Sequence, residues 1–171
     1  MRQIMNNNAL ALIGLCNEYC AFVENAPAMT RDEFVAKAVK LLPRMYIAAS
    51  DLPEADAFMT DGYIEPALNE DVYEQVREGI AALLGADDTY LEVFEDDMKY
   101  SDTPIAASVA EGLADIFQSC YNFVEMIRDA PEYIAESALE GMREDFVDYW
   151  SQIVCNVMRP LNQLRHTEPE E

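Results

Sequence analysis

Apolar residues recur every three or four positions along most of the chain, and this α-helical period is the strongest constraint on its fold. The first stripe covers residues 8–25 and is formed by Leu12, Cys16, Tyr19 and Val23. Runs of β-branched residues are scarce. Because a helix with one apolar face must bury that face against another element, the pattern predicts an all-α fold.

A capping signal predicts where the second helix begins. Thr30 and Glu33 are three residues apart and have the spacing of a capping box, in which each side chain pairs with the backbone N–H of the other residue. Pro43 lies inside the apolar pattern that follows. Since proline cannot donate a backbone hydrogen bond, it predicts a kink or a restart of this helix.

Three further helices complete the set. Asn69 is the expected N-cap of a helix over about 70–84, which Gly85 ends. Thr103-Pro104 predicts the start of a fourth helix, because proline is favoured in the first turn. The last apolar stripe predicts one helix, or two pieces of one, over about 132–164.

Two segments lack this periodicity, residues 51–69 and 86–103. The alternation in "TYLEVF" permits a short strand, but a lone strand would have no sheet to join, and a helical turn is an equal alternative. The sequence therefore predicts an antiparallel bundle of about five main helices with two long irregular connections. We expect one helical domain over 1–165 and a frayed acidic tail over 166–171.

The charge of the chain restricts its partners. It has 33 acidic and 11 basic residues, a formal net charge of −22. Because nucleic-acid affinity depends largely on Lys and Arg, direct binding to DNA or RNA is disfavoured, as is attraction to anionic membranes. A basic protein partner is favoured instead, although acidity also serves simply to keep a protein soluble.

The cysteines and the apolar runs indicate a cytoplasmic protein. Cys16, Cys20, Cys120 and Cys155 show neither a CxxC pair nor a disulfide framework, and we expect buried free thiols. No apolar stretch reaches the ~20 residues that span a bilayer. The polar "NNN" and Glu18 interrupt the only run that resembles an export signal.

Acidic residues also recur at helical spacing. Glu111 and Asp115 are four apart, as in some metal-dependent hydrolases, but on a helical wheel they lie opposite the apolar face and are predicted to be solvated. A row of acids four apart runs from Glu132 to Asp148. Of this row, Glu140, Glu144 and Asp148 are expected to lie opposite the core, on a solvated face or a docking stripe for a basic partner.

The familiar catalytic constellations are absent from the sequence. The only histidine, His166, lies in the tail, so triads that need a positioned imidazole are not expected. Neither a Walker-type loop nor GxGxxG occurs, and the Glu-x-x-His pairs of di-iron bundles are missing. No metal or cofactor is predicted.

Three features are taken together: the segment "TYLEVFEDD" at 89–97, the segment "ASVAEGLADIF" at 107–117, and Trp150 with the "MRPLNQL" ending. In these features the chain resembles an uncharacterised bacterial family of small, acidic, all-helical proteins. The resemblance is greatest in the second half of the chain. Members often place a histidine beside the matching tryptophan, whereas Tyr149 stands here. The family is a domain of unknown function, so the resemblance implies a helical fold and a bacterial origin but no activity.

The leading functional hypothesis is a non-enzymatic interaction protein that binds a basic partner. Its candidate partner-binding residues combine aromatic anchors with charge in the 86–103 connection and on the last helix: Tyr90, Phe94, Asp96, Asp97, Glu140, Glu144 and Asp148. Tyr90 and Phe94 equally suit a structural role at the end of the bundle. The alternatives are a carboxylate- or metal-dependent enzyme and a regulator that mimics nucleic acid.

Overall fold

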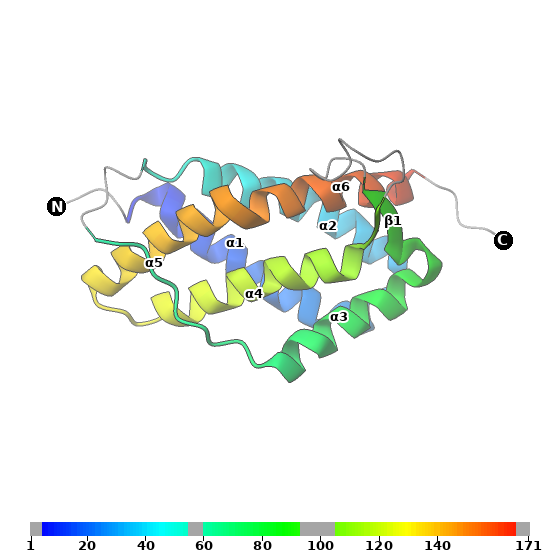
Figure 1. Ribbon diagram of the computed structural model, residues 1–171, viewed down its shortest axis with the longest axis horizontal. Helices are drawn as coiled ribbons and strands as arrows, with labels where there is room; N and C mark the ends of the chain where they lie inside the picture. The colour runs from blue at the N-terminus through cyan, green and yellow to red at the C-terminus, as the bar shows by residue number, and fades with distance from the viewer. Residues whose placement is uncertain (1–4, 55–59, 93–104, 167–171) are drawn as a thin grey trace.

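A computed structural model describes residues 5–54, 60–92 and 105–166. In these residues the chain forms an elongated bundle of helices with one small pair of strands, which confirms the predicted all-α class (Figure 1). The long helices are α1 Asn7–Glu24, α2 Arg31–Ser50, α3 Glu70–Leu84, α4 Val109–Ile127, α5 Glu132–Asp145 and α6 Ser151–Arg165. The short turns are η1 Ala26–Ala28, η3 Gly85–Asp88 and η5 Phe146–Trp150. Among the described helices, none has both the length and the apolar character to cross a bilayer.

The helix α4 occupies the centre of the bundle. It packs against α1, α3, α5 and α6. Its apolar stripe is buried as the periodicity predicts, and Leu113, Ile116 and Phe117 are fully inaccessible to solvent. Burying side chains of this size contributes about 2 kcal/mol each, so this stripe is a main source of stability.

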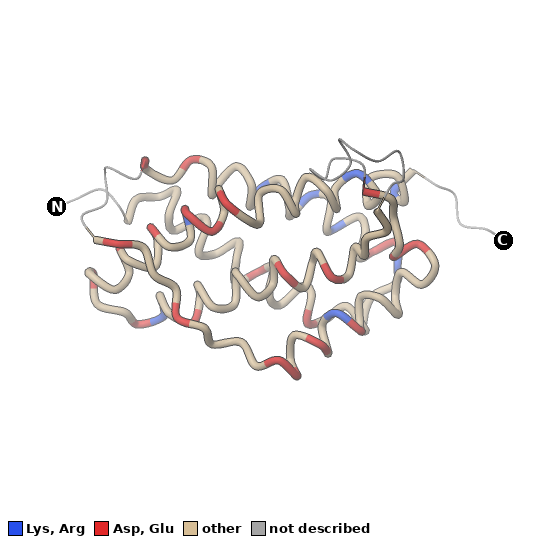
Figure 2. The backbone as a smooth tube through the Cα atoms, viewed as in Figure 1, with Lys and Arg blue, Asp and Glu red and all other residues tan. Residues whose placement is uncertain are grey.

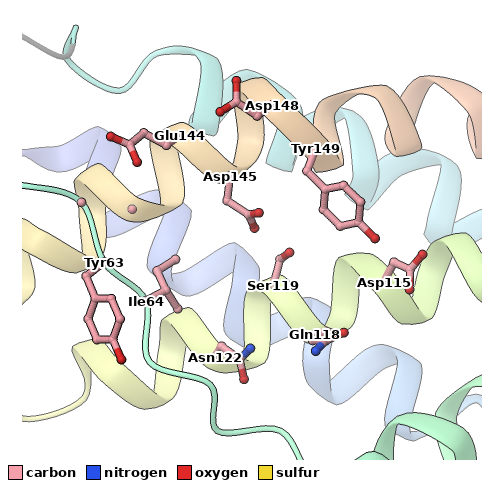
Figure 3. Close-up of a pocket in the computed structure, with 12 residues that line it drawn as sticks. Tyr63, Ile64, Asp115, Gln118, Ser119, Asn122, Glu144, Asp145, Asp148 and Tyr149 are labelled. Carbon is pink, nitrogen blue, oxygen red and sulfur yellow. The ribbon is translucent and has the colours of Figure 1, made fainter. Parts of the chain in front are cut away.

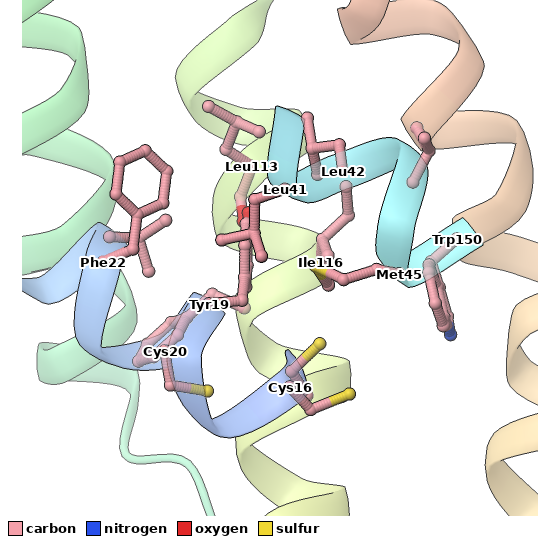
Figure 4. Packing of buried hydrophobic residues seen from close by; sticks show 14 of the residues in the cluster. Cys16, Tyr19, Cys20, Phe22, Leu41, Leu42, Met45, Leu113, Ile116 and Trp150 are labelled. Atoms are coloured by element: carbon pink, nitrogen blue, oxygen red, sulfur yellow. The ribbon is translucent and has the colours of Figure 1, made fainter. Parts of the chain in front are cut away.

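The core between α1 and α4 contains the buried hydroxyl group of Tyr19. Tyr19 is fully buried, and its hydroxyl donates a 2.6 Å hydrogen bond to the backbone oxygen of Leu113. Figure 4 shows Tyr19 among the apolar side chains of the core. Burial raises the pKa of Tyr19 well above its ordinary value, which keeps the hydroxyl protonated as a donor. The bond fixes α1 against α4.

The predicted caps of α2 and α3 are confirmed. The Thr30 hydroxyl accepts a hydrogen bond from the Glu33 N–H at 3.2 Å, and the Glu33 carboxylate accepts one from the Thr30 N–H at 3.0 Å. Asn69 caps α3, and Gly85, at φ 59°, ends it. Pro43 lies inside α2, which continues without a restart to its end.

The fourth helix begins later than predicted. Its first residue is Val109 and its N-cap is Ser108, whereas the predicted start at Thr103-Pro104 lies outside the described residues. Residues Ile105–Ser108 form a strand, β2, which pairs antiparallel with β1, Thr89–Glu92. The expectation that a strand in "TYLEVF" would have no partner was therefore wrong. Four residues are too few for periodicity to separate a strand from the first turn of a helix.

The predicted last helix is continuous but contains a π-helical turn at η5, between α5 and α6. Met142, Phe146, Trp150 and Val154 are four residues apart and all buried. In a regular α-helix a four-residue spacing overshoots one turn by about 40°, so such a row would leave the core. The wider π turn returns it towards the core.

Acidic and basic residues are distributed unevenly over the helices. Figure 2 shows Asp and Glu distributed along α3, α4 and α5, while Lys and Arg are found mainly on α2 and α6. The sequence of α6 contains two arginines and no acidic residue. The face of the bundle that carries α4 and α5 is therefore the more negative one.

Candidate functional site

A pocket of about 530 Å³ lies between α4 and the helix made by α5 and η5 (Figure 3). Part of its wall comes from the strap, which we define as residues 60–69. The lining residues are Gly62, Tyr63, Ile64, Asp115, Gln118, Ser119, Asn122, Gly141, Glu144, Asp145, Asp148 and Tyr149. Four of these are acidic and none is basic, so the pocket has a negative potential.

The strap is held against α5 where two glycines meet. A Cβ atom on Gly62 would lie 2.8 Å from the backbone nitrogen of Gly141, and one on Gly141 would lie 2.9 Å from that of Tyr63. The Tyr63 N–H donates to the Ser137 backbone oxygen at 3.1 Å, and the Ser137 hydroxyl donates to the Asp61 backbone oxygen at 2.8 Å. Glycine at both positions lets the two backbones approach this closely.

A second attachment joins the strap to α4. The side-chain oxygen of Asn122 accepts hydrogen bonds from the N–H groups of Ala67 at 2.9 Å and Leu68 at 2.8 Å. An irregular segment needs such partners, because its backbone groups are not paired in a helix or a sheet. The strap is thus irregular, as predicted for 51–69, and forms a fixed wall of the pocket.

The structure places Glu111 and Asp115 in different environments. Glu111 is exposed, as predicted, but Asp115 is half-buried and accepts a 2.6 Å hydrogen bond from the Tyr73 hydroxyl. The Tyr149 hydroxyl also bonds to Asp115. Burial, followed by the charge of Asp115, raises the pKa of Tyr149 to about 12. The predicted solvated face is wrong for Asp115, because tyrosines from α3 and η5 reach across to it.

Asp145 extends from α5 towards α4 and accepts a hydrogen bond from the hydroxyl of Ser119 (Figure 3). Burial raises the pKa of Asp145 above its ordinary value, and the nearby charge of Asp148 raises it further, although the bond from Ser119 acts in the opposite direction. A carboxyl group with a raised pKa inside a cavity is typical of functional sites.

None of the residues that line the pocket is basic, so the lining itself does not balance its negative charge. The ion pairs between described residues leave out all four acids of the lining, which are Asp115, Glu144, Asp145 and Asp148. Glu144 and Asp148 are exposed. Partial loss of hydration raises the pKa of Glu144, and its hydrogen bond with Glu140 and the charge of that residue add to the effect, although the charge of Arg143 acts in the opposite direction. A positively charged ligand would complement this site.

Glu140 is not on a solvated face, and this prediction was wrong. Its side chain is only 6% exposed and makes a two-pronged ion pair with Arg143, with both N–O distances 2.8 Å. The strap covers it, because the position of a Cβ on Gly62 lies 3.0 Å from the Glu140 Cγ. Glu140 therefore cannot contact a partner directly, whereas Glu144 and Asp148 are exposed at the pocket.

The other predicted contact residues lie away from this pocket. Tyr90 is half-buried, packs against the core and lines a second cavity, of about 620 Å³, beside the end of α6. Phe94, Asp96 and Asp97 lie outside the described residues. The structural role foreseen for Tyr90 is the one its packing supports.

The cysteines and the other possible metal ligands do not form a metal site within the described residues. Cys16, Cys20 and Cys120 are buried free thiols, as expected, while Cys155 is exposed, contrary to expectation. Within residues 5–54, 60–92 and 105–166, no three or more His, Cys, Asp or Glu side chains are arranged to hold a metal ion. His166 is exposed at the C-cap of α6.

A family model described as a domain of unknown function, DUF5063, matches residues 3–167. The chain belongs to this family. Its fold is similar to that in the crystal structure of protein BF1032 from Bacteroides fragilis, a structural genomics target, with 28% sequence identity and a TM-score of 0.82. The similarity covers 98% of each chain. No curated protein matches the sequence significantly.

Sequence reasoning missed Asp145, Ser119 and Tyr149 as parts of one site. They come from two helices that meet only in the folded chain, so no pattern along either helix brings them together. A usable signal was Gly141, an isolated glycine in a helical pattern beside acidic residues. Such a glycine often marks the close approach of another backbone.

Proposed function

We propose that this protein is a non-enzymatic interaction protein that binds a basic segment of a protein partner at the acidic pocket. The observation that supports it most is a cavity lined by four carboxylates, none of which takes part in an ion pair between described residues. Lys or Arg from a partner would supply the missing positive charge. The overall charge of −22 would also accelerate encounter with a basic partner.

The pKa shifts are those expected of a site that binds a cation. Loss of hydration and neighbouring negative charges raise the pKa of Asp145 and Glu144, which makes their ionised forms less favourable in the free protein. A bound cation would favour those ionised forms. Binding should therefore become tighter as the pH rises through the pKa of these groups, and weaker below it.

We further propose that the partner is met in the cytoplasm. The four cysteines are free thiols, and thiols remain reduced in that compartment.

A DNA-binding protein is one class of basic partner that this acidic surface suits. A protein that mimics nucleic acid is therefore a special case of the proposal.

A carboxylate-dependent enzyme is the second candidate function. The raised pKa of Asp145 in a cavity favours it, since carboxyl groups with shifted pKa values are typical of active sites. Incubation with the small molecules of a bacterial extract, followed by mass spectrometry, would separate the two. An enzyme would consume a compound with wild-type protein and leave it with Asp145→Asn, whereas a binding protein would consume nothing.

The test of the main proposal compares two double variants with equal net charge. Asp145→Asn with Asp148→Asn neutralises the pocket, while Glu18→Gln with Glu78→Gln removes two exposed charges from α1 and α3. Each is used to capture proteins from bacterial cytosol at low and at high salt. We expect the wild type and the α1/α3 variant to retain the same basic protein, the pocket variant to lose it, and high salt to release it.

If both double variants lost the captured protein to the same extent, net charge alone would explain its binding. That result would contradict the pocket as the binding site. Capture that persists at high salt would contradict the electrostatic basis of the proposal. Circular dichroism of each variant checks that the helical fold is retained.

A further inference from the structure

We infer that the group seated in the acidic pocket is the guanidinium of an arginine side chain, presented by an extended basic segment of the partner. This inference rests on the proposed function and specifies its ligand. The decisive juxtaposition is that Asp115 and Asp145, on α4 and α5, lie on either side of the Tyr149 ring (Figure 3).

The arrangement of the acids suits an organic cation better than a bare metal ion. In the described residues no three potential ligands converge on one point. The carboxylates are instead spread over α4, α5 and η5 around about 530 Å³ of space. A ligand that reaches them together needs several donors that point in different directions. Guanidinium has five N–H donors fanned out in one plane.

The tyrosines favour arginine over lysine. Tyr63 and Tyr149 both line the pocket and keep 56% and 47% of their surface exposed. A guanidinium is planar and weakly hydrated, so it can stack on an aromatic ring while its edges reach carboxylates. A lysine ammonium is a compact, strongly hydrated charge and loses more solvation when it enters such a space.

The acids at the pocket edge favour a basic segment rather than an isolated amino acid. Glu144 and Asp148 are exposed, and in Figure 3 they point away from the side on which Asp145 faces α4. Residues on either side of the seated arginine would pass these carboxylates. Positive charges in those neighbours would therefore add to the affinity and make it depend on salt.

The experiment measures the binding of two blocked peptides of equal length by calorimetry at low salt. In one, glycine alternates with arginine, and in the other it alternates with lysine; spermine and Mg²⁺ are titrated separately. We expect wild-type protein to bind the arginine peptide about fivefold more tightly than the lysine peptide. Asp145→Asn should weaken the binding of both peptides.

Two variants of Tyr149 isolate the contribution of the ring. Tyr149→Leu should bring the two peptides to nearly equal affinity, because it removes the stacking surface. Tyr149→Phe keeps the ring and loses only the hydroxyl bond to Asp115, so the preference for arginine should remain. A merely structural role of Tyr149 would lower the affinity for both peptides by the same factor in both variants, which would contradict the inference.

The outcomes separate this inference from the function on which it rests. Equal binding of both peptides to wild-type protein, weakened by Asp145→Asn, would overturn the arginine inference and leave the proposed function standing. Binding of spermine or Mg²⁺ at the pocket, without either peptide, would overturn both in favour of a small-cation site. If none of the four probes binds, both are again overturned.

Discussion

Asp145 illustrates how a single residue can be unfavourable for stability and suited to binding. Its carboxyl group has a raised pKa, chiefly because it is largely removed from water. A group whose pKa is higher in the folded state contributes stability below its unfolded pKa, and this contribution is lost as the pH rises through the folded value. At neutral pH the ionised Asp145 therefore lowers the free energy of unfolding.

We accordingly predict that Asp145→Asn makes the free protein more stable at neutral pH, by on the order of 1 kcal/mol. The asparagine can still accept the bond from Ser119 but carries no charge. Thermal unfolding followed by circular dichroism should show the gain at pH 7 and its disappearance near pH 3.5, below the ordinary aspartate pKa of about 3.9. A gain that is the same at both pH values would contradict the ionisation argument.

Glu140 should behave in the opposite way. We predict that Glu140→Ala lowers the free energy of unfolding by about 3 kcal/mol, because it leaves the guanidinium of Arg143 largely buried without its carboxylate. Glu78→Ala on α3, where the glutamate side chain is 70% exposed, is the control and should change stability by less than about 0.5 kcal/mol. Urea denaturation measures both. Similar effects of the two substitutions would show that the Glu140 pair is solvated.

At the scale of the elements, the contact between the strap and α5 determines the shape of the pocket. We predict that Gly141→Ala costs about 1–3 kcal/mol, because the new methyl group would lie 2.9 Å from the Tyr63 backbone. Gly14→Ala is the matched control: its Cβ meets nothing within 4 Å, and alanine is the better helix former inside α1. Urea denaturation should show destabilisation by the first substitution and a small gain from the second.

The elements differ in how far the sequence could predict them. Local signals were sufficient for α1, for the capping box at Thr30 and for the end of α3 at Gly85, since each depends on residues a few positions apart. The pairing of β1 with β2 and the covering of Glu140 by Gly62 depend on contacts between distant parts of the chain. Periodicity within one segment carries no information about such contacts.

The same distinction applies to the candidate site. That Glu144 and Asp148 are exposed followed from the helical wheel. The helical wheel could not show that Asp145 and Tyr149 face α4 across a pocket, because this depends on the position of the neighbouring helix. The acidic composition predicted the chemistry of a partner, but it could not distinguish this pocket from the rest of an acidic surface.

For the whole molecule, the excess of acidic residues should make stability depend on salt. With a net charge of −22 the folded chain repels itself, and salt reduces this repulsion as the screening length falls from about 30 Å at 0.01 M to about 8 Å at 0.15 M. We predict that Tm rises over this range of NaCl concentration. Sucrose of matched osmolarity is the control for effects that do not involve charge, and a Tm that falls with NaCl would contradict the prediction.

The π turn at η5 limits how sequences with this fold can vary in length. Deleting one residue from 146–150 would restore regular α-helical winding and turn α6 by about 100° relative to α5. Either Val157 and Leu161 would then leave the core, or Asp145 would turn away from α4. Single substitutions in this stretch keep the number of residues and thus the winding of the helix. The loss of one residue would instead disrupt either the packing of α6 or the pocket formed by α5.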